Sequence, residues 1–346
     1  MFWYLLKRFF FLFDPETAHY LSMNLLNFGL KIPIVSYFLT KSFQYENKNL
    51  LCTVDGMEFS NPVGLAAGFD KDGRWLKALQ TLGFGFVEVG TVTPKSQSGN
   101  DKPRLFRLIK DASIINRMGF NNGGVEAIVK KLELFKPHKK IIIGGNIGKN
   151  KNTPNDQASE DYLICFRALH EHVDYFAINV SSPNTANLRS LQDKEPLMDL
   201  LSRLQIENKK HKNQKPIYLK IAPDLSRDQV KDVIEAATLT GIQGLILTNT
   251  TIRRPEFLKE KEQSKEAGGL SGLAIQNFSN EVLQWVKESN SKLSLIGVGG
   301  INNSKAAIEK IQLGADLIQI YSGMIFEGPW MIKNIKKELS LSDKRN

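Results

Sequence analysis

Tyr-Phe-Ala-Ile-Asn-Val-Ser-Ser-Pro-Asn-Thr, residues 175–185, is the stretch that decides the fold. Its apolar run at 175–178 predicts a buried strand, and the polarity changes abruptly at the end of that run. Two amides, two serine hydroxyls and a turn-forming proline follow together. A strand that ends in so many hydrogen-bonding side chains suits a site for a planar polar ligand, and Ser182 stands there as a potential proton acceptor.

The same pattern of a short apolar run recurs along the chain, with helix-like stretches between most of the runs. The runs are 63–66, 85–89, 141–144, 175–180, 217–221, 244–247, 295–298 and 317–320, and the helix-like stretches include 124–135, 157–172, 227–240 and 303–313. Eight strand-helix units favour a (β/α)8 TIM barrel. An open, doubly wound sheet is the alternative, but its glycine-rich turn after the first strand is absent.

Polar or glycine-rich segments follow all eight runs. They are 67–71, 90–93, 145–150, 179–185, 220–223, 248–251, 297–300 and 321–323. Because barrel active sites lie at the carboxyl ends of the strands, we expect these segments to form one rim that carries the site. The long insertion 94–138 interrupts the regular spacing and is expected to be a functional loop or lid.

The residue types on this rim narrow the ligand. Glycines and a Tyr-Ser pair after the last two runs, together with Gly272, suggest a phosphate held by backbone N–H groups. Amides can pair with rings that carry both N–H and C=O groups, and five asparagines occur on the rim: Asn116, Asn146, Asn179, Asn184 and Asn249. Lys71 and Lys220 can hold negative charge on a ligand.

No histidine follows any predicted strand, so histidine-based acid–base chemistry is poorly supported. Ser182 would then act as a weak base on an already activated C–H bond. Such a role fits proton removal next to a carbonyl, coupled to the departure of a hydride.

The N-terminal segment 1–46 differs from the catalytic barrel expected over 47–346. The first 45 residues hold 13 of the 32 aromatic residues. Asp14 and Pro15 predict a helix start, Gly29 can cap its end, and Pro33 permits a short helix through Phe38. These helices carry more apolar surface than one face needs, so they either pack on the barrel or enter a membrane interface.

Composition excludes several classes of protein. The net charge is +10, but the lysines are spread along the chain without an arginine-rich arm, so no nucleic-acid partner is expected. The two cysteines form no Cys-x-x-Cys pattern, and no metal site is expected. Each N-terminal apolar run falls short of the ~20 residues needed to cross a bilayer.

Seven motifs resemble those of the dihydroorotate dehydrogenase family, and the resemblance covers essentially the whole chain. They are AGFDK (67–71), NRMGFNN (116–122), NIGKN (146–150), SSPNT (181–185), KIAPDL (220–225), TNTT (248–251) and GVGGI (297–301). The resemblance implies FMN-dependent oxidation of dihydroorotate to orotate in pyrimidine synthesis. It implies one FMN per chain, and that Ser182 takes the C5 proton while hydride leaves C6 for the flavin N5.

The resemblance also implies the residues that hold each ligand. Those implied for the substrate are Lys71, Asn116, Arg117, Met118, Gly119, Phe120, Asn179, Asn184, Asn249 and Thr250, with the 116–120 loop closing over the ring. Those implied for FMN are Ala67, Gly68, Phe69, Asp70, Lys71, Thr91, Asn146, Asn179, Lys220, Thr248, Gly272, Gly300, Tyr321 and Ser322.

The catalytic serine indicates one branch of this family. The soluble branch, which uses fumarate or NAD, has cysteine at the position of Ser182, whereas the membrane branch has serine and an N-terminal helical extension that admits quinone. The resemblance therefore implies a peripheral protein on the cytoplasmic side of the cell membrane, with quinone as electron acceptor and the bilayer surface as partner. His19 and Arg107 match the quinone-tunnel positions. Ala186-Asn187 departs from the usual Pro-Gly, and asparagine is expected to preserve the turn.

Two alternatives remain at this level. Another FMN barrel reduces a uracil ring in tRNA, but it would need a cysteine acid near the flavin and a basic RNA-binding domain, and neither is visible. A membrane-docked flavin-binding module without turnover is the non-enzymatic alternative.

Overall fold

The computed structural model describes residues 2–342. Eight parallel strands form a closed barrel in the order β10-β12-β13-β3-β4-β7-β8-β9. These strands are β3 (Val63–Asp70), β4 (Phe86–Val92), β7 (Ile142–Ile147), β8 (Tyr175–Asn179), β9 (Ile217–Ile221), β10 (Gly244–Leu247), β12 (Ser294–Val298) and β13 (Leu317–Ile320). The predicted TIM barrel is confirmed.

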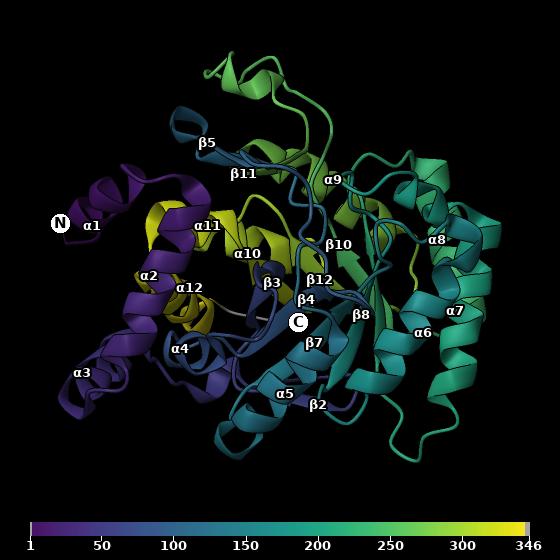
Figure 1. The fold of residues 1–346 in the computed structure, drawn as a ribbon, viewed down its shortest axis with the longest axis horizontal. Helices are drawn as coiled ribbons and strands as arrows, with labels where there is room; N and C mark the ends of the chain where they lie inside the picture. Colours follow the sequence, from purple (N-terminus) through teal and green to yellow (C-terminus); the bar gives the residue numbers. More distant parts are fainter. Residues whose placement is uncertain (1, 343–346) are drawn as a thin grey trace.

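Helices surround this barrel (Figure 1). They are α4 (Leu76–Thr81), α5 (Val125–Phe135), α6 (Ala158–Leu169), α7 (Lys194–Asn208), α8 (Arg227–Thr240), α9 (Gln276–Glu288), α10 (Ser304–Gln312), α11 (Ser322–Glu327) and α12 (Trp330–Leu341). Local sequence sets their ends. In α8, for example, Ser226 and Gln229 form a reciprocal capping box, and Gly241 ends the helix with φ +73°.

Aromatic side chains fill the amino-terminal half of the barrel, and glycines make room for them. A Cβ atom on Gly64 would lie 2.3 Å from the Phe86 ring, and one on Gly144 would lie 2.2 Å from the Tyr175 ring. The hairpin of β1 (Cys52–Val54) and β2 (Met57–Phe59) packs against this layer through Phe59. The bottom of the barrel is therefore closed, which leaves the carboxyl ends of the strands for a site.

Three predicted strand ends were too early. The runs expected to stop at residues 66, 89 and 144 continue as β3, β4 and β7 through Asp70, Val92 and Ile147. The parallel pairing is irregular there, with register shifts between Leu65 and Asp70 and between Val89 and Val92. Polar groups expected after these strands thus project from their last residues.

The insertion 94–138 is mostly ordered secondary structure. β5 (Leu105–Leu108) and β6 (Ser113–Asn116) form an antiparallel pair, and β6 also pairs with β11 (Gly269–Gly272). This small sheet stands beside the rim and carries Asn116 and Gly272 to it. The insertion contributes a rigid wall as well as a loop.

Helices α1 (Phe2–Phe11), α2 (Pro15–Gly29) and α3 (Pro33–Phe43) lie together on one side of the barrel (Figure 1). Asp14 caps α2 as expected. Two details were wrong: Leu30, not Gly29, is the C-cap of α2, and α3 continues beyond Phe38. In both places the chain stays in right-handed helical geometry, so no glycine turn is needed.

The N-terminal helices are attached to the barrel on their inner side. Glu16 forms a bidentate ion pair with Arg104, with N–O distances of 3.0 and 2.8 Å, and both side chains are buried. The Phe43 and Trp330 rings lie 4.9 Å apart. Large apolar side chains remain exposed on the three helices, including those of Leu5, Phe28, Ile34 and Phe38. Among residues 2–342, no helix is long and apolar enough to cross a membrane.

Candidate active site

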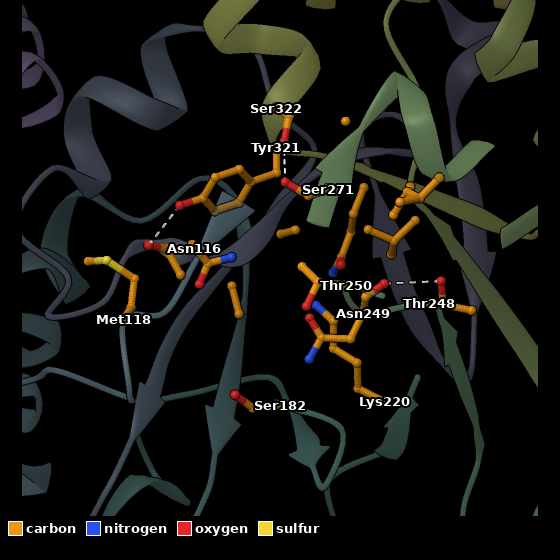
Figure 2. A pocket seen from close by; sticks show the side chains of 18 of the residues that line it. Asn116, Met118, Ser182, Lys220, Thr248, Asn249, Thr250, Ser271, Tyr321 and Ser322 are labelled. Atoms are coloured by element: carbon orange, nitrogen blue, oxygen red, sulfur yellow. Dashed lines mark hydrogen bonds between the residues drawn. The ribbon is translucent and has the colours of Figure 1, made fainter. Parts of the chain in front are cut away.

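A cleft of about 1070 Å³, including solvent at its mouth, opens at the carboxyl ends of the barrel strands. Figure 2 shows its side chains converging from several strands and from the small sheet. Most predicted ligand-binding residues line it: Ala67, Gly68, Lys71, Thr91, Asn116, Met118, Gly119, Phe120, Asn179, Ser182, Asn184, Lys220, Thr248, Asn249, Thr250, Gly272, Gly300, Tyr321 and Ser322. Seven of the eight predicted segments therefore contribute residues to one cleft; segment 145–150 does not line it.

Ser182 lies at the wall of this cleft and is almost fully buried, with 6% of its surface exposed. Its Oγ accepts a hydrogen bond of 3.2 Å from the backbone N–H of Asn184. The Asn184 amide donates to Oδ1 of Asn116 at 3.2 Å, which ties the serine loop to β6. The serine is thus held in place with its hydroxyl proton free to be directed elsewhere.

A chain of amides and hydroxyls crosses the floor of the cleft. Asn249 donates to Ser181 Oγ at 3.0 Å, Asn179 donates to Thr91 Oγ1 at 2.9 Å, and Thr91 donates to Asn146 Oδ1 at 2.6 Å. These bonds fix which amide edges remain available to a ligand. The arrangement suits a planar ring with alternating N–H and C=O groups.

Two lysines bring positive charge to the cleft. Lys71 donates to the backbone carbonyl of Gly68 at 2.8 Å, and burial lowers its pKa to about 8. Lys220 lies 3.8 Å from the carboxylate of Glu88; burial lowers the pKa of Lys220, and Glu88 opposes this shift. Both ammonium groups are set against the wall of the cleft rather than in bulk water.

The opposite end of the cleft is built from glycines and hydroxyls. Ser271 and Ser322 share a hydrogen bond of 2.8 Å (Figure 2). Gly300 has φ +77°, and a Cβ atom there would lie 2.3 Å from Cβ of Gln276. Only glycine fits this close approach, which leaves the backbone open to a ligand.

Known proteins match the chain over nearly its full length. A family model described as "Dihydroorotate dehydrogenase" matches residues 49–342. The chain is 55% identical over 330 residues to "Dihydroorotate dehydrogenase (quinone)" of Christiangramia forsetii, covering 95% of this chain and 96% of the relative. It is 48% identical over 336 residues to the protein of that name from Aeromonas salmonicida, covering 96% and 98%.

Solved structures agree with this match. The ligand-free crystal structure of DHODH from Eimeria tenella superposes with a TM-score of 0.83 at 36% identity, covering 94% of each chain. The complex of that enzyme with ferulenol gives the same TM-score and covers 94% of this chain and 90% of the other. The chain belongs to the dihydroorotate dehydrogenase family.

Four residues that the family resemblance implied lie outside the cleft lining. Arg117 pairs with Glu266 at 2.6 Å, the Asp70 carboxylate accepts backbone N–H groups of the turn before α4, Asn146 lies beneath the floor, and Phe69 faces a second cavity. Their motifs are present, but each side chain makes a contact within the protein. Their roles toward substrate and FMN remain predictions.

Sequence reasoning missed several lining residues, among them Ser271, Ile275 and Gln319. It also missed Glu88, which is fully buried beneath the cleft. For Glu88 and Gln319 the sequence did offer a signal, because each is a polar residue inside an apolar run. Side chains of a barrel strand alternate between the inside and the outside of the barrel, so such a residue can point toward the site.

The second cavity, of about 1630 Å³, lies between the N-terminal helices and the barrel. Its lining is mainly aromatic and aliphatic, and both predicted quinone-site residues, His19 and Arg107, line it. His19 Nε2 lies 2.8 Å from the carbonyl oxygen of Phe69, and burial lowers the His19 pKa to about 4. Arg107 donates to the Phe10, Phe11 and Phe13 carbonyls at the end of α1.

The two cavities share a wall. Gly68, Lys71, Met118 and Tyr321 line both of them. Tyr321 donates to the Gly68 carbonyl at 3.3 Å, which closes part of this wall. A single layer of residues therefore separates the cleft from the apolar cavity.

The described residues contain one cluster of metal-ligating type, His170, Glu171 and His211, and none of the three lines either cavity. The two imidazole rings stack 3.6 Å apart with planes 17° from parallel. Their in-plane lone pairs therefore run side by side and do not converge on one ion. The expectation that the protein holds no metal stays a prediction.

Proposed function

We propose that this protein oxidises dihydroorotate to orotate in pyrimidine synthesis, with FMN in the rim cleft and a membrane quinone as the final electron acceptor. The observation that carries the proposal is the pairing of two cavities across one wall. One is polar and contains Ser182 and the amide cluster, and the other is apolar and contains His19 and Arg107.

The residues of the cleft fit FMN. The Nζ atom of Lys220 has no hydrogen-bond acceptor among residues 2–342, and Oε1 of Gln319 is buried without a partner. Both residues line the cleft, so each offers a free group to a polar ring. At the other end, Gly272, Gly300 and Ser322 suit the phosphate. When bound there, FMN supplies an acceptor for hydride.

In this proposal Ser182 Oγ accepts the substrate proton while its own hydroxyl proton passes on toward solvent at the mouth of the cleft, so the serine stays neutral. Its Oγ already accepts the Asn184 N–H at 3.2 Å, which orients a lone pair, and its burial excludes bulk water. Asn116, Asn179, Asn184 and Asn249 would hold the ring edges, and Lys71 would hold the carboxylate. A serine base is sufficient only because the proton lies next to a carbonyl and the hydride leaves in concert.

The N-terminal segment 1–46 serves quinone access in this proposal. Exposed apolar side chains on α1–α3, together with the exposed Arg8, Lys31 and Lys41, suit the surface of an anionic bilayer on the cytoplasmic side. The apolar cavity behind them would then open toward the acyl chains. Sedimentation with anionic vesicles tests this part, and a protein that stays in the supernatant at low salt would contradict it.

Purified protein with dihydroorotate and ubiquinone, menaquinone, fumarate or NAD as acceptor tests the proposed function. Rapid orotate formation is expected with a quinone and little with fumarate or NAD. Fumarate or NAD as the best acceptor would contradict the quinone assignment, and absence of bound flavin would contradict the whole proposal. No observation favours the tRNA-reducing or non-enzymatic alternatives.

A further inference from the structure

Glu88 is a carboxylate buried beneath the cleft, with none of its surface exposed. It lies on β4 and accepts hydrogen bonds from three other barrel strands. Asn146 Nδ2 donates to it at 3.2 Å, Tyr175 OH donates at 3.2 Å, and Gln319 Nε2 also donates. Such a set of donors stabilises an ionised carboxylate inside a protein.

The only cation that faces this carboxylate among the described residues is Lys220 on β9, whose Nζ lies 3.8 Å from Oε2. That distance allows attraction but is too long for a hydrogen bond. The donors of Lys220 therefore remain available to the cleft while its charge is partly balanced from below. Gln319 and Lys220 both contact the cleft, so Glu88 is linked to the ligand through two lining residues.

The other titratable groups around the pair do not add charge. Burial raises the pKa of Tyr175 on β8 well above its ordinary value, as it does for Tyr218 on β9, so both phenols are neutral. Asn146 on β7 and Gln319 on β13 are amides. The electrostatic field at this end of the cleft is thus set mainly by one ammonium and one carboxylate.

We propose that Glu88 is a positioning residue that fixes the Lys220 ammonium against the ring of the bound flavin, offsets part of its positive charge, and so lowers the flavin reduction potential. This inference rests on the proposed function, because it assumes FMN in the cleft. Reduction adds negative charge to the ring, so an uncompensated ammonium favours the reduced form. The negative charge of Glu88 weakens the preference of the ammonium for the reduced ring. The reduced ring therefore remains able to pass its electrons on.

The test is the midpoint potential of bound flavin in Glu88→Gln, measured against reference dyes at pH 6. Low pH keeps Lys220 protonated, because loss of Glu88 removes an interaction that raises the Lys220 pKa. We expect the affinity for reduced relative to oxidised flavin to rise about tenfold, which is a potential higher by about 30 mV for a two-electron couple. An unchanged or lower potential would overturn the proposal.

Two further variants separate charge from structure. Tyr175→Phe removes one hydrogen bond from the same carboxylate but no charge, and should leave the potential near that of the wild type. If Glu88→Gln does not fold with flavin, Glu88→Asp retracts the carboxylate from Lys220 by one methylene and should raise the potential by a smaller amount. No rise in Glu88→Asp, or an equal rise in Tyr175→Phe, would contradict a role for the charge.

Failure of this inference is distinguishable from failure of the proposed function. Wild-type protein that binds flavin and is bleached by dihydroorotate, while the variants show no rise in potential, would remove only the role of Glu88. Wild-type protein without flavin, or with flavin that dihydroorotate does not reduce, would remove the function on which the inference depends.

Discussion

The rim cleft at the strand ends and the second cavity, which lies between the N-terminal helices and the barrel (the N-terminal cavity), share four lining residues. Their linings differ in chemistry. The cleft is lined by amides, hydroxyls, glycines and two lysines, which are brought together by the barrel strand ends and the small sheet beside them. The N-terminal cavity is lined mainly by aromatic and aliphatic side chains of α1–α3 and the adjoining barrel face. The barrel and its small sheet therefore supply the polar cleft, and the N-terminal helices supply much of the apolar cavity.

Burial also acts differently on the titratable groups of the two cavities. It lowers the pKa of Lys71 at the shared wall only to about 8, where nearby Glu16 helps to retain the charge, but lowers that of His19 to about 4. At neutral pH the polar cleft therefore keeps a cation while His19 is neutral. This contrast suits an anionic substrate on one side and a neutral quinone on the other.

A substitution that removes the proposed base from the polar cleft should have the largest effect on the rate of flavin reduction. Ser182→Ala should retain FMN but slow flavin reduction by dihydroorotate by roughly 10²–10⁴-fold, because a general base contributes about that much. Stopped-flow absorbance under anaerobic conditions measures the rate. Ser190→Ala, a serine on the same loop whose hydroxyl bonds only to backbone and to Asn155, is the matched control. Unchanged reduction in Ser182→Ala would remove the serine from its role.

A substitution that fills part of the N-terminal cavity should leave the reduction of flavin by dihydroorotate intact. Ala18 on α2 is buried and lines the N-terminal cavity, so Ala18→Phe should fill part of it and lower quinone turnover by about tenfold or more, with flavin reduction unaffected. Thr17→Phe places the same ring on the exposed face of the same helix and should keep wild-type turnover. Equal quinone rates in both variants would contradict quinone access through this cavity.

Lys71, which lines both cavities, predicts that kcat/KM depends on pH. If the Lys71 ammonium holds the substrate carboxylate, kcat/KM should be flat below pH 8 and fall about tenfold per pH unit above it, because the lowered pKa of Lys71 is about 8. Lys71→Arg stays charged across this range. A fall that persists at the same pH in that variant would show that another group titrates.

The smallest expected effect concerns the loop that follows Ser182. Asn187 adopts φ +54°, and its carbonyl accepts a bond of 2.7 Å from Asn155 Nδ2. Asparagine here does adopt the left-handed conformation that was expected of it, and the match to the turn formed by Pro-Gly stays a prediction. Asn187→Ala should lower the free energy of unfolding by about 1–2 kcal/mol, whereas Asn187→Gly should be nearly neutral. Urea unfolding checks both, and equal stability of the Ala and wild-type proteins would contradict the strain.

Much of the barrel and the cleft could be predicted from the sequence, because polar or glycine-rich residues follow each apolar strand. The limits were physical. Thr91 and Asn146 are polar but still lie within strands, so β4 and β7 were cut short. Glu88 was missed because a carboxylate in an apolar run shows its partners only when distant strands meet. Arg117 belongs to the substrate-loop motif, yet its side chain turns to Glu266.

The most direct test of two ligand sites across one wall is a pair of anaerobic additions to the purified protein. In the wild-type protein, dihydroorotate should bleach the flavin absorbance, and a soluble quinone added afterwards should restore it. In Ala18→Phe, bleaching should proceed at the wild-type rate while restoration slows. Restoration at the wild-type rate in Ala18→Phe, or bleaching that slows in parallel with it, would contradict separate access for the two reactants.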